Sequence, residues 1–161
     1  MYQRDAAKME AWVENYLNKK NNVPSEVVVH LVFATQWLFF EKNWNWTLKK
    51  IHEISDGGNG LEKLRCVGGL VKIITEQAIS EDRKITYKEW HDVACAFAEA
   101  IEILRREVVE RHETGVFAEE KFKHFKFVID SLFILSRAYI PVIFEIAFEI
   151  YGPSPMYLGV N

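Results

Sequence analysis

Apolar side chains recur at alternating intervals of four and three residues over a long stretch in the middle of the chain. They are Trp90, Ala94, Phe97, Ile101, Leu104 and Val108. This is the a/d spacing of a heptad repeat, which places all of them on one side of an α-helix. A β-strand would instead alternate apolar and polar residues every two positions. The chain is therefore predicted to contain a long helix that begins at the capping-box sequence Thr86–Glu89 and ends near Glu113.

A second segment repeats the same spacing and predicts another long helix, over residues 117–140. Its apolar positions are Ala118, Phe122, Phe125, Ile129, Leu132, Ser136 and Tyr139. Between residues 127 and 135 the sequence is apolar on nearly every side, except at Asp130 and Ser131. A helix with one solvent-exposed face does not have this pattern. We expect this helix to lie at the centre of a bundle or to be covered by a partner subunit.

The remaining helices are predicted over residues 5–20, 26–42, 47–55, 61–78 and 142–151, separated by clusters of Asn, Gly and Pro. Ser25 and Thr47 are the expected N-caps of two of them. The sequence thus predicts an all-α fold, an antiparallel helical bundle of five to seven helices with two long central helices. A single domain is expected to cover residues 1–161, with residues 152–161 as an extended tail.

Composition restricts the class of protein. The chain has 161 residues, 49% hydrophobic residues and a formal net charge of −3, which favour one domain with a large core and no general attraction to nucleic acid. Two cysteines are too few for a disulfide framework, and the first residues lack the apolar region of a signal peptide. Residues 127–151 contain four charged side chains and Pro141, which argues against a transmembrane segment. A cytoplasmic location is expected.

Metal binding has weak support in the spacing of acids and histidines. Glu99 and Glu102 form a Glu-x-x-Glu motif, and Glu120 lies four residues before His124. These four residues would be the ligands in an alternative function, a carboxylate-Mg-dependent nucleotide hydrolase of helical type. Helical pyrophosphatases of this kind place Glu-x-x-Asp after Glu-x-x-Glu, whereas this sequence has the reverse order. A solvated acidic helix face is the favoured interpretation. No cofactor is expected, and the sequence contains no nucleophile elbow or P-loop.

A basic patch is predicted at Lys121, Lys123 and Lys126, which alternate with Phe122 and Phe125. Clustered cations with aromatic neighbours can bind nucleic acid, so a nucleic-acid-associated accessory subunit is a second alternative. The phenylalanines occupy heptad positions, however, and the net charge is slightly acidic. Both features disfavour nucleic acid as a partner.

A cluster of aromatic residues provides the main indication of function. Trp37, Phe40, Trp44 and Trp46 lie within ten residues, more than one face of a helix can bury. Tryptophan anchors many protein interfaces because it contributes a large contact area. We expect these four residues to form a partner interface. The expected function is a non-enzymatic helical interaction or assembly module that self-associates through aromatic and heptad surfaces. Its partner would be itself, as a dimer or higher oligomer, or another protein.

Overall fold

The computed structural model describes residues 2–19, 23–41, 44–55, 57–115, 118–138 and 140–151, and these segments confirm the all-α prediction. The expected tail at residues 152–161 lies outside them. The elements are α1 (Tyr2–Lys19), α2 (Ser25–Gln36), the π-helical segment η1 (Trp37–Glu41), α3 (Trp44–Ser55), α4 (Asn59–Ser80), α5 (Tyr87–Glu113), α6 (Glu119–Ala138) and α7 (Ile140–Tyr151).

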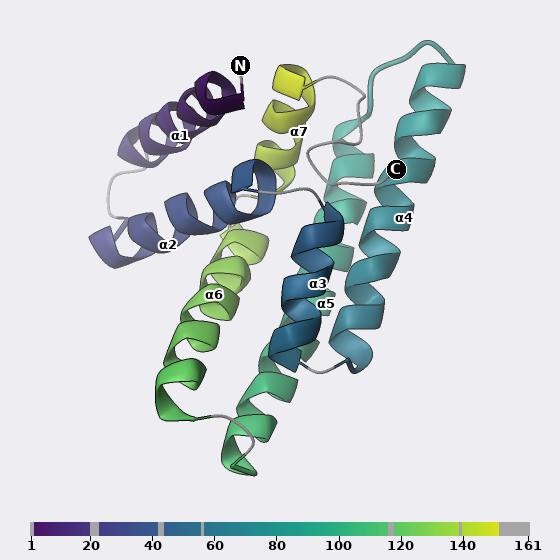
Figure 1. Cartoon of the computed structure of the whole chain (residues 1–161). Helices are drawn as coiled ribbons and strands as arrows, with labels where there is room; N and C mark the ends of the chain where they lie inside the picture. Colours follow the sequence, from purple (N-terminus) through teal and green to yellow (C-terminus); the bar gives the residue numbers. More distant parts are fainter. Residues whose placement is uncertain are drawn as a thin grey trace.

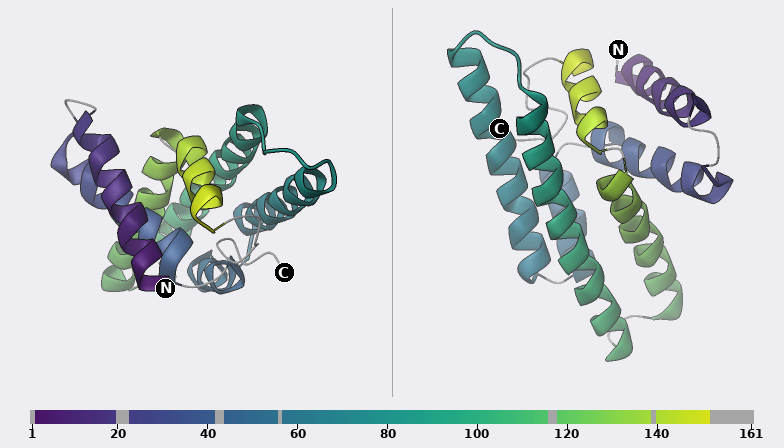
Figure 2. Two further views of the ribbon diagram at one scale, coloured as in Figure 1. Left: turned by 90° about the horizontal axis from the view of Figure 1, so that it is seen from above. Right: turned by 180° about the vertical axis from the view of Figure 1, so that it is seen from behind.

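Two long helices, α5 and α6, lie at the centre of the bundle. α5 packs against α4 and α6, while α6 packs on its other side against α2 (Figure 1). Figure 2 shows α7 beside the first half of α5, with α1 crossing over α2. On the α2 side, the ring of Phe127 lies 4.7 Å from that of His30 and 4.8 Å from that of Phe33. Neighbours on both sides explain why residues 127–135 are apolar almost all round.

The heptad positions of α5 are buried within the chain itself. None of the six side chains from Trp90 to Val108 is more than 4% exposed. Trp90, at the start of the repeat, stacks on Phe144 of α7 with the ring centroids 5.8 Å apart. This surface is therefore already occupied inside the bundle, and a partner has to contact another part of the molecule.

The capping box of α5 is confirmed, whereas the two other predicted N-caps are wrong. The Thr86 hydroxyl accepts from the Glu89 backbone N–H at 3.1 Å, and the Glu89 carboxylate accepts from the Thr86 N–H at 3.0 Å. α2 begins directly after Pro24 and has no side-chain cap. α3 begins at Trp44 rather than Thr47, because the buried Trp44 side chain anchors this end of the helix to the core.

No single helix among the described residues combines the length and apolar composition needed to cross a membrane. The segments Glu119–Arg137 and Ile140–Ile150 meet that test only together, and they are bent by 91° at the break between them.

Candidate binding groove between α5 and α6

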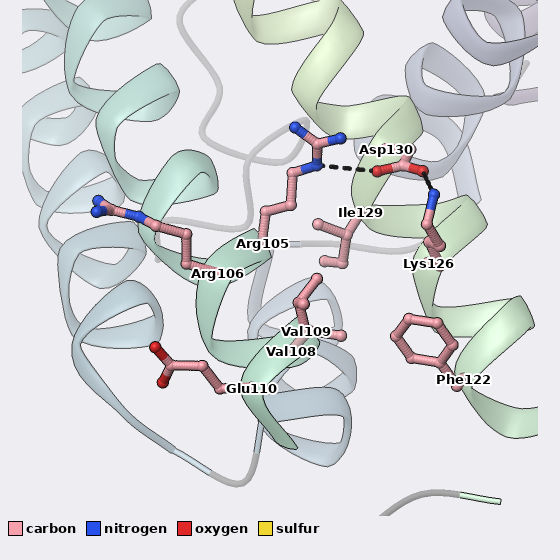
Figure 3. Close-up of a pocket in the computed structure, with 9 residues that line it drawn as sticks. All are labelled: Arg105, Arg106, Val108, Val109, Glu110, Phe122, Lys126, Ile129 and Asp130. Carbon is pink, nitrogen blue, oxygen red and sulfur yellow. Dashed lines mark hydrogen bonds and ion pairs between the residues drawn. The ribbon is translucent and has the colours of Figure 1, made fainter. Parts of the chain in front are cut away.

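A groove of about 320 Å³ lies between the second half of α5 and the first half of α6 (Figure 3). Its apolar lining consists of Val108, Val109, Phe122 and Ile129. Charged side chains surround this lining, and they are Arg105, Arg106, Glu110, Lys126 and Asp130. Its size is at the lower end of the range for small-ligand and anchor-residue pockets, roughly 300–1,000 Å³. The groove can thus accept an apolar side chain.

Helix periodicity explains why these residues meet. On α5 the buried heptad positions face the core, so Arg105 and Val109, four residues apart, lie together on its flank toward α6. On α6 the spacing of Phe122, Lys126 and Ile129 brings them to the flank toward α5. The apolar members of both flanks therefore line the floor of the groove, while the long cationic side chains reach its rim.

The charges around the groove are unbalanced in favour of cations. Asp130, whose side chain is 20% exposed, accepts from Arg105 Nε at 3.1 Å and from Lys126 Nζ at 2.7 Å. Figure 3 shows these two side chains on either side of the carboxylate, with Arg106 extending away from it. Arg106 has no ion pair or hydrogen bond with any residue that the structure describes. Three cationic and two acidic side chains line the groove, so the surface favours an acidic partner.

Phe122, which lines the groove, stacks against a side chain of the other helix. The rings of His112 and Phe122 are nearly parallel, with centroids 3.6 Å apart and an interplanar angle of 11°. His112 Nε2 also lies 3.5 Å from a carboxylate oxygen of Glu119 at the start of α6. These contacts fix the position of Phe122, so the apolar wall of the groove is held in place before any ligand arrives.

Of the predicted basic patch, Lys126 alone lines the groove. Lys121 lies over the ring of Phe125, 5.9 Å from its centroid, and Lys123 is exposed. The predicted patch therefore contributes one of the three cations, and Arg105 and Arg106 of α5 supply the others. These two arginines belong to no site predicted from the sequence. Arg105 and Arg106 lie four and three residues before Val109, and Phe122, Lys126 and Ile129 have similar spacings. These helical spacings were the signal in the sequence that each set shares one helix face.

The four residues of the metal hypothesis are separated in the structure. Glu99 accepts a hydrogen bond from Lys63 at 2.8 Å, and this bond lowers the pKa of the Glu99 carboxyl. Glu102 accepts from Arg137 at 2.7 Å. Glu120 and His124 are exposed on α6. Within the described segments, no three His, Cys, Asp or Glu side chains are grouped so that they could hold a metal ion.

The predicted aromatic interface is divided between surface and core. Trp44 is only 3% exposed and packs against Gly68 of α4, where a side chain would collide with its indole nitrogen. Trp37 and Trp46 are half-buried, with ring centroids 5.7 Å apart, and line a smaller pocket of about 230 Å³ with His124 and Phe125. The side chain of Phe40 lies outside the described part of the structure.

Comparisons with protein-family models, with curated proteins and with solved structures found no match to this chain.

Proposed function

We propose that the chain is a non-enzymatic helical interaction module that self-associates, with α7 of one copy docked in the α5–α6 groove of another. The supporting observation is that the chain carries a groove and a ridge of complementary chemistry. The groove has an apolar floor and an excess of cations. The ridge, on the outer side of α7, has apolar residues flanked by carboxylates.

The ridge is the outer side of α7. Val142, Glu145, Ile146 and Glu149 follow the i, i+3, i+4, i+7 spacing that places them on one helix face. Glu145 and Glu149 are exposed, and Val142 and Ile146 are half-buried. Neither carboxylate has a hydrogen bond or ion pair within the described segments. Ile146 can enter the groove while the carboxylates approach the cationic rim, which favours this pairing both by burial and by charge.

The two surfaces lie at opposite ends of the molecule. Figure 1 shows α7 near one end of α5, whereas the groove lies toward the other end, where α5 and α6 are joined. Contact between different surfaces of identical subunits is heterologous, and in an open head-to-tail dimer it leaves one groove and one ridge unfilled. The proposed association is therefore head-to-tail, and the average mass should increase with concentration.

Light scattering after size-exclusion chromatography tests this proposal with two charge-reversed variants. Arg106→Glu alters the groove, and the double variant Glu145→Lys/Glu149→Lys alters the ridge. Each alone is expected to weaken association at least tenfold, because like charges then face each other. An equimolar mixture is expected to recover association, since one variant retains an intact groove and the other an intact ridge.

Lys72→Glu is the matched control, because Lys72 is an exposed cation on α4 outside the groove. It should associate like the unaltered chain. A chain that is monomeric at every concentration would contradict the proposal and leave the groove for a different acidic partner. Association that is insensitive to both charge reversals, but lost in Trp37→Ala or Trp46→Ala, would move the interface to the tryptophan pair.

A further inference from the structure

A second pocket lies on the other side of the Arg105–Asp130 ion pair, between α2, α5 and α6. It encloses about 380 Å³. The lining residues are Glu26, Val27, His30, Arg105, Asp130, Phe133 and Ile134. It differs from the α5–α6 groove in one respect: a histidine held by a buried hydroxyl faces it.

The hydrogen bonds of Ser131 determine which nitrogen of His30 carries the proton. Ser131 is completely buried, and its single hydroxyl hydrogen is donated to the carbonyl oxygen of Phe127 at 2.7 Å. His30 Nδ1 lies 2.6 Å from the same hydroxyl oxygen. Both bonds form together when Nδ1–H is the donor and the Ser131 oxygen accepts it. Neutral His30 therefore carries its proton on Nδ1 and presents the lone pair of Nε2.

The acceptor side of the pocket lies on α2. Glu26 is exposed and has no ion pair or hydrogen bond within the described segments. It precedes His30 by four residues, so its carboxylate and the imidazole lie on the same helix face. A carboxylate and a nitrogen lone pair that share one pocket form a site for a donor group with positive charge, such as a primary ammonium.

The donor side of the pocket is the guanidinium of Arg105. Its Nε is bonded to Asp130, and its plane lies over the ring of Phe133 with Cζ 4.5 Å from the centroid. The two terminal nitrogens make no hydrogen bond within the described residues, and Figure 3 shows them on the far side of the group from the α5–α6 groove. Two parallel N–H donors match the two oxygens of a carboxylate.

We infer that this pocket binds a small zwitterion with an apolar side chain, of the α-amino acid class. The ligand ammonium lies between Glu26 and His30 Nε2, and its carboxylate meets the terminal nitrogens of Arg105. Its apolar side chain contacts Val27 and Ile134. Both halves of the ligand contribute to binding, because Glu26 attracts a cation while the free donors of Arg105 attract an anion.

Titration of the full chain with L-leucine, followed by NMR chemical shifts and calorimetry, tests the inference. The Arg106→Glu variant is a suitable background because it removes the proposed self-association without changing a residue that lines this pocket. We expect saturable binding of L-leucine. Isopentylamine lacks the carboxylate and 4-methylpentanoate lacks the ammonium, so each is expected to bind at least tenfold more weakly.

Two variants separate the binding role of Glu26 from the positioning role of Ser131. Glu26→Gln is expected to weaken L-leucine binding at least tenfold, whereas Glu14→Gln, at an exposed glutamate on α1, should leave it unchanged. Ser131→Ala removes the acceptor for Nδ1–H. It should weaken binding several-fold and shift the ¹⁵N signals of the His30 ring toward the Nε2–H tautomer.

Several results would overturn the inference. Absence of saturable shifts with L-leucine would do so, as would equal affinity in the Glu26→Gln and Glu14→Gln variants. Isopentylamine binding as tightly as L-leucine would eliminate the role of Arg105. Unchanged ¹⁵N signals in Ser131→Ala would eliminate the fixed tautomer.

Discussion

The carboxylate of Glu107 on α5 accepts a hydrogen bond of 2.8 Å from the backbone N–H of Gly60, in the first turn of α4. Its other oxygen accepts from the Asn59 N–H at 3.0 Å. No residue at the start of α4 provides a side-chain cap, since the position before the helix is Gly58. A side chain 47 residues away therefore satisfies the free N–H groups and places a negative charge at the positive end of the helix dipole.

Replacing Glu107 with alanine should destabilise the fold by about 1–2 kcal/mol, the usual cost of losing a capping side chain. The measurement is urea unfolding followed by circular dichroism. Glu110→Ala is the control, because Glu110 is an exposed glutamate one turn later whose carboxylate accepts no hydrogen bond from the described residues. Equal midpoints for the two variants would show that the cap contributes nothing to stability.

Gly60 allows α4 to approach the backbone of α5 closely. Its replacement with alanine should therefore destabilise the fold more than Glu107→Ala does. A Cβ at this position would lie 2.7 Å from Leu104 Cα and 2.8 Å from Leu104 N, both of which are backbone atoms within α5. Since a helix backbone cannot move aside locally, α4 would have to shift. We expect a loss of about 2–3 kcal/mol, as for other overpacked sites. Destabilisation by less than 1 kcal/mol would indicate that the two helices separate easily.

Gly68 and Gly69 are adjacent in α4, and replacing them with alanine should change the stability of the fold in opposite directions. Gly68 has the indole of Trp44 against it, whereas a Cβ at Gly69 would have no atom within 4 Å. Gly68→Ala should lower stability by about 1–3 kcal/mol, because the buried Trp44 would be displaced. Gly69→Ala should raise it by about 0.5–1 kcal/mol, since glycine is unfavourable inside a helix. Thermal unfolding of both variants measures the difference, and changes of the same sign would contradict it.

Interactions between residues close together in the sequence were predictable, whereas those between residues far apart in the sequence were not. The start of α5 was predictable because the capping box joins Thr86 to Glu89, three residues apart. The buried face of α5, and that of α6 from Phe125 to Ser136, was predictable because helical periodicity alone assigns it, whereas Ala118 is exposed and Phe122 is half-buried. The first turn of α3 was missed, since it depends on packing of Trp44 against Gly68, and so was the π-helical turn that begins at Trp37.

The candidate sites follow the same rule. Arg105 and Asp130 are 25 residues apart, and His30 and Ser131 are separated by 101. Neither pair is related by periodicity within one element. Only the packing of α6 between α2 and α5 brings them together, and a single sequence does not specify that packing. The sequence therefore indicated only part of the α5–α6 groove, namely the basic patch that contains Lys126.

The ion pair between Arg83 and Glu89 should make stability depend on pH in the acidic range. Two hydrogen bonds from Arg83, with a further bond from the Thr86 N–H, lower the pKa of Glu89 from its ordinary value of 4.5 to about 2. A carboxyl whose pKa is lower in the folded state stabilises the fold fully above pH 4.5, and this contribution is lost as the pH falls toward 2. Glu81 and Glu99 also have lowered pKa values, so the chain as a whole should lose stability in this range.

Comparison with Glu89→Gln isolates the part due to Glu89. Glutamine at this position can still accept from the Thr86 N–H, because the capping box tolerates either residue, so the substitution removes mainly the charge. Urea midpoints measured from pH 7 to pH 2.5 should show a lower stability for the variant at pH 7 and a shallower decline below pH 4.5. The two curves should converge at the acidic end, where Glu89 approaches its neutral form. Parallel curves over the whole range would mean that the Glu89 charge contributes equally to the folded and unfolded chains.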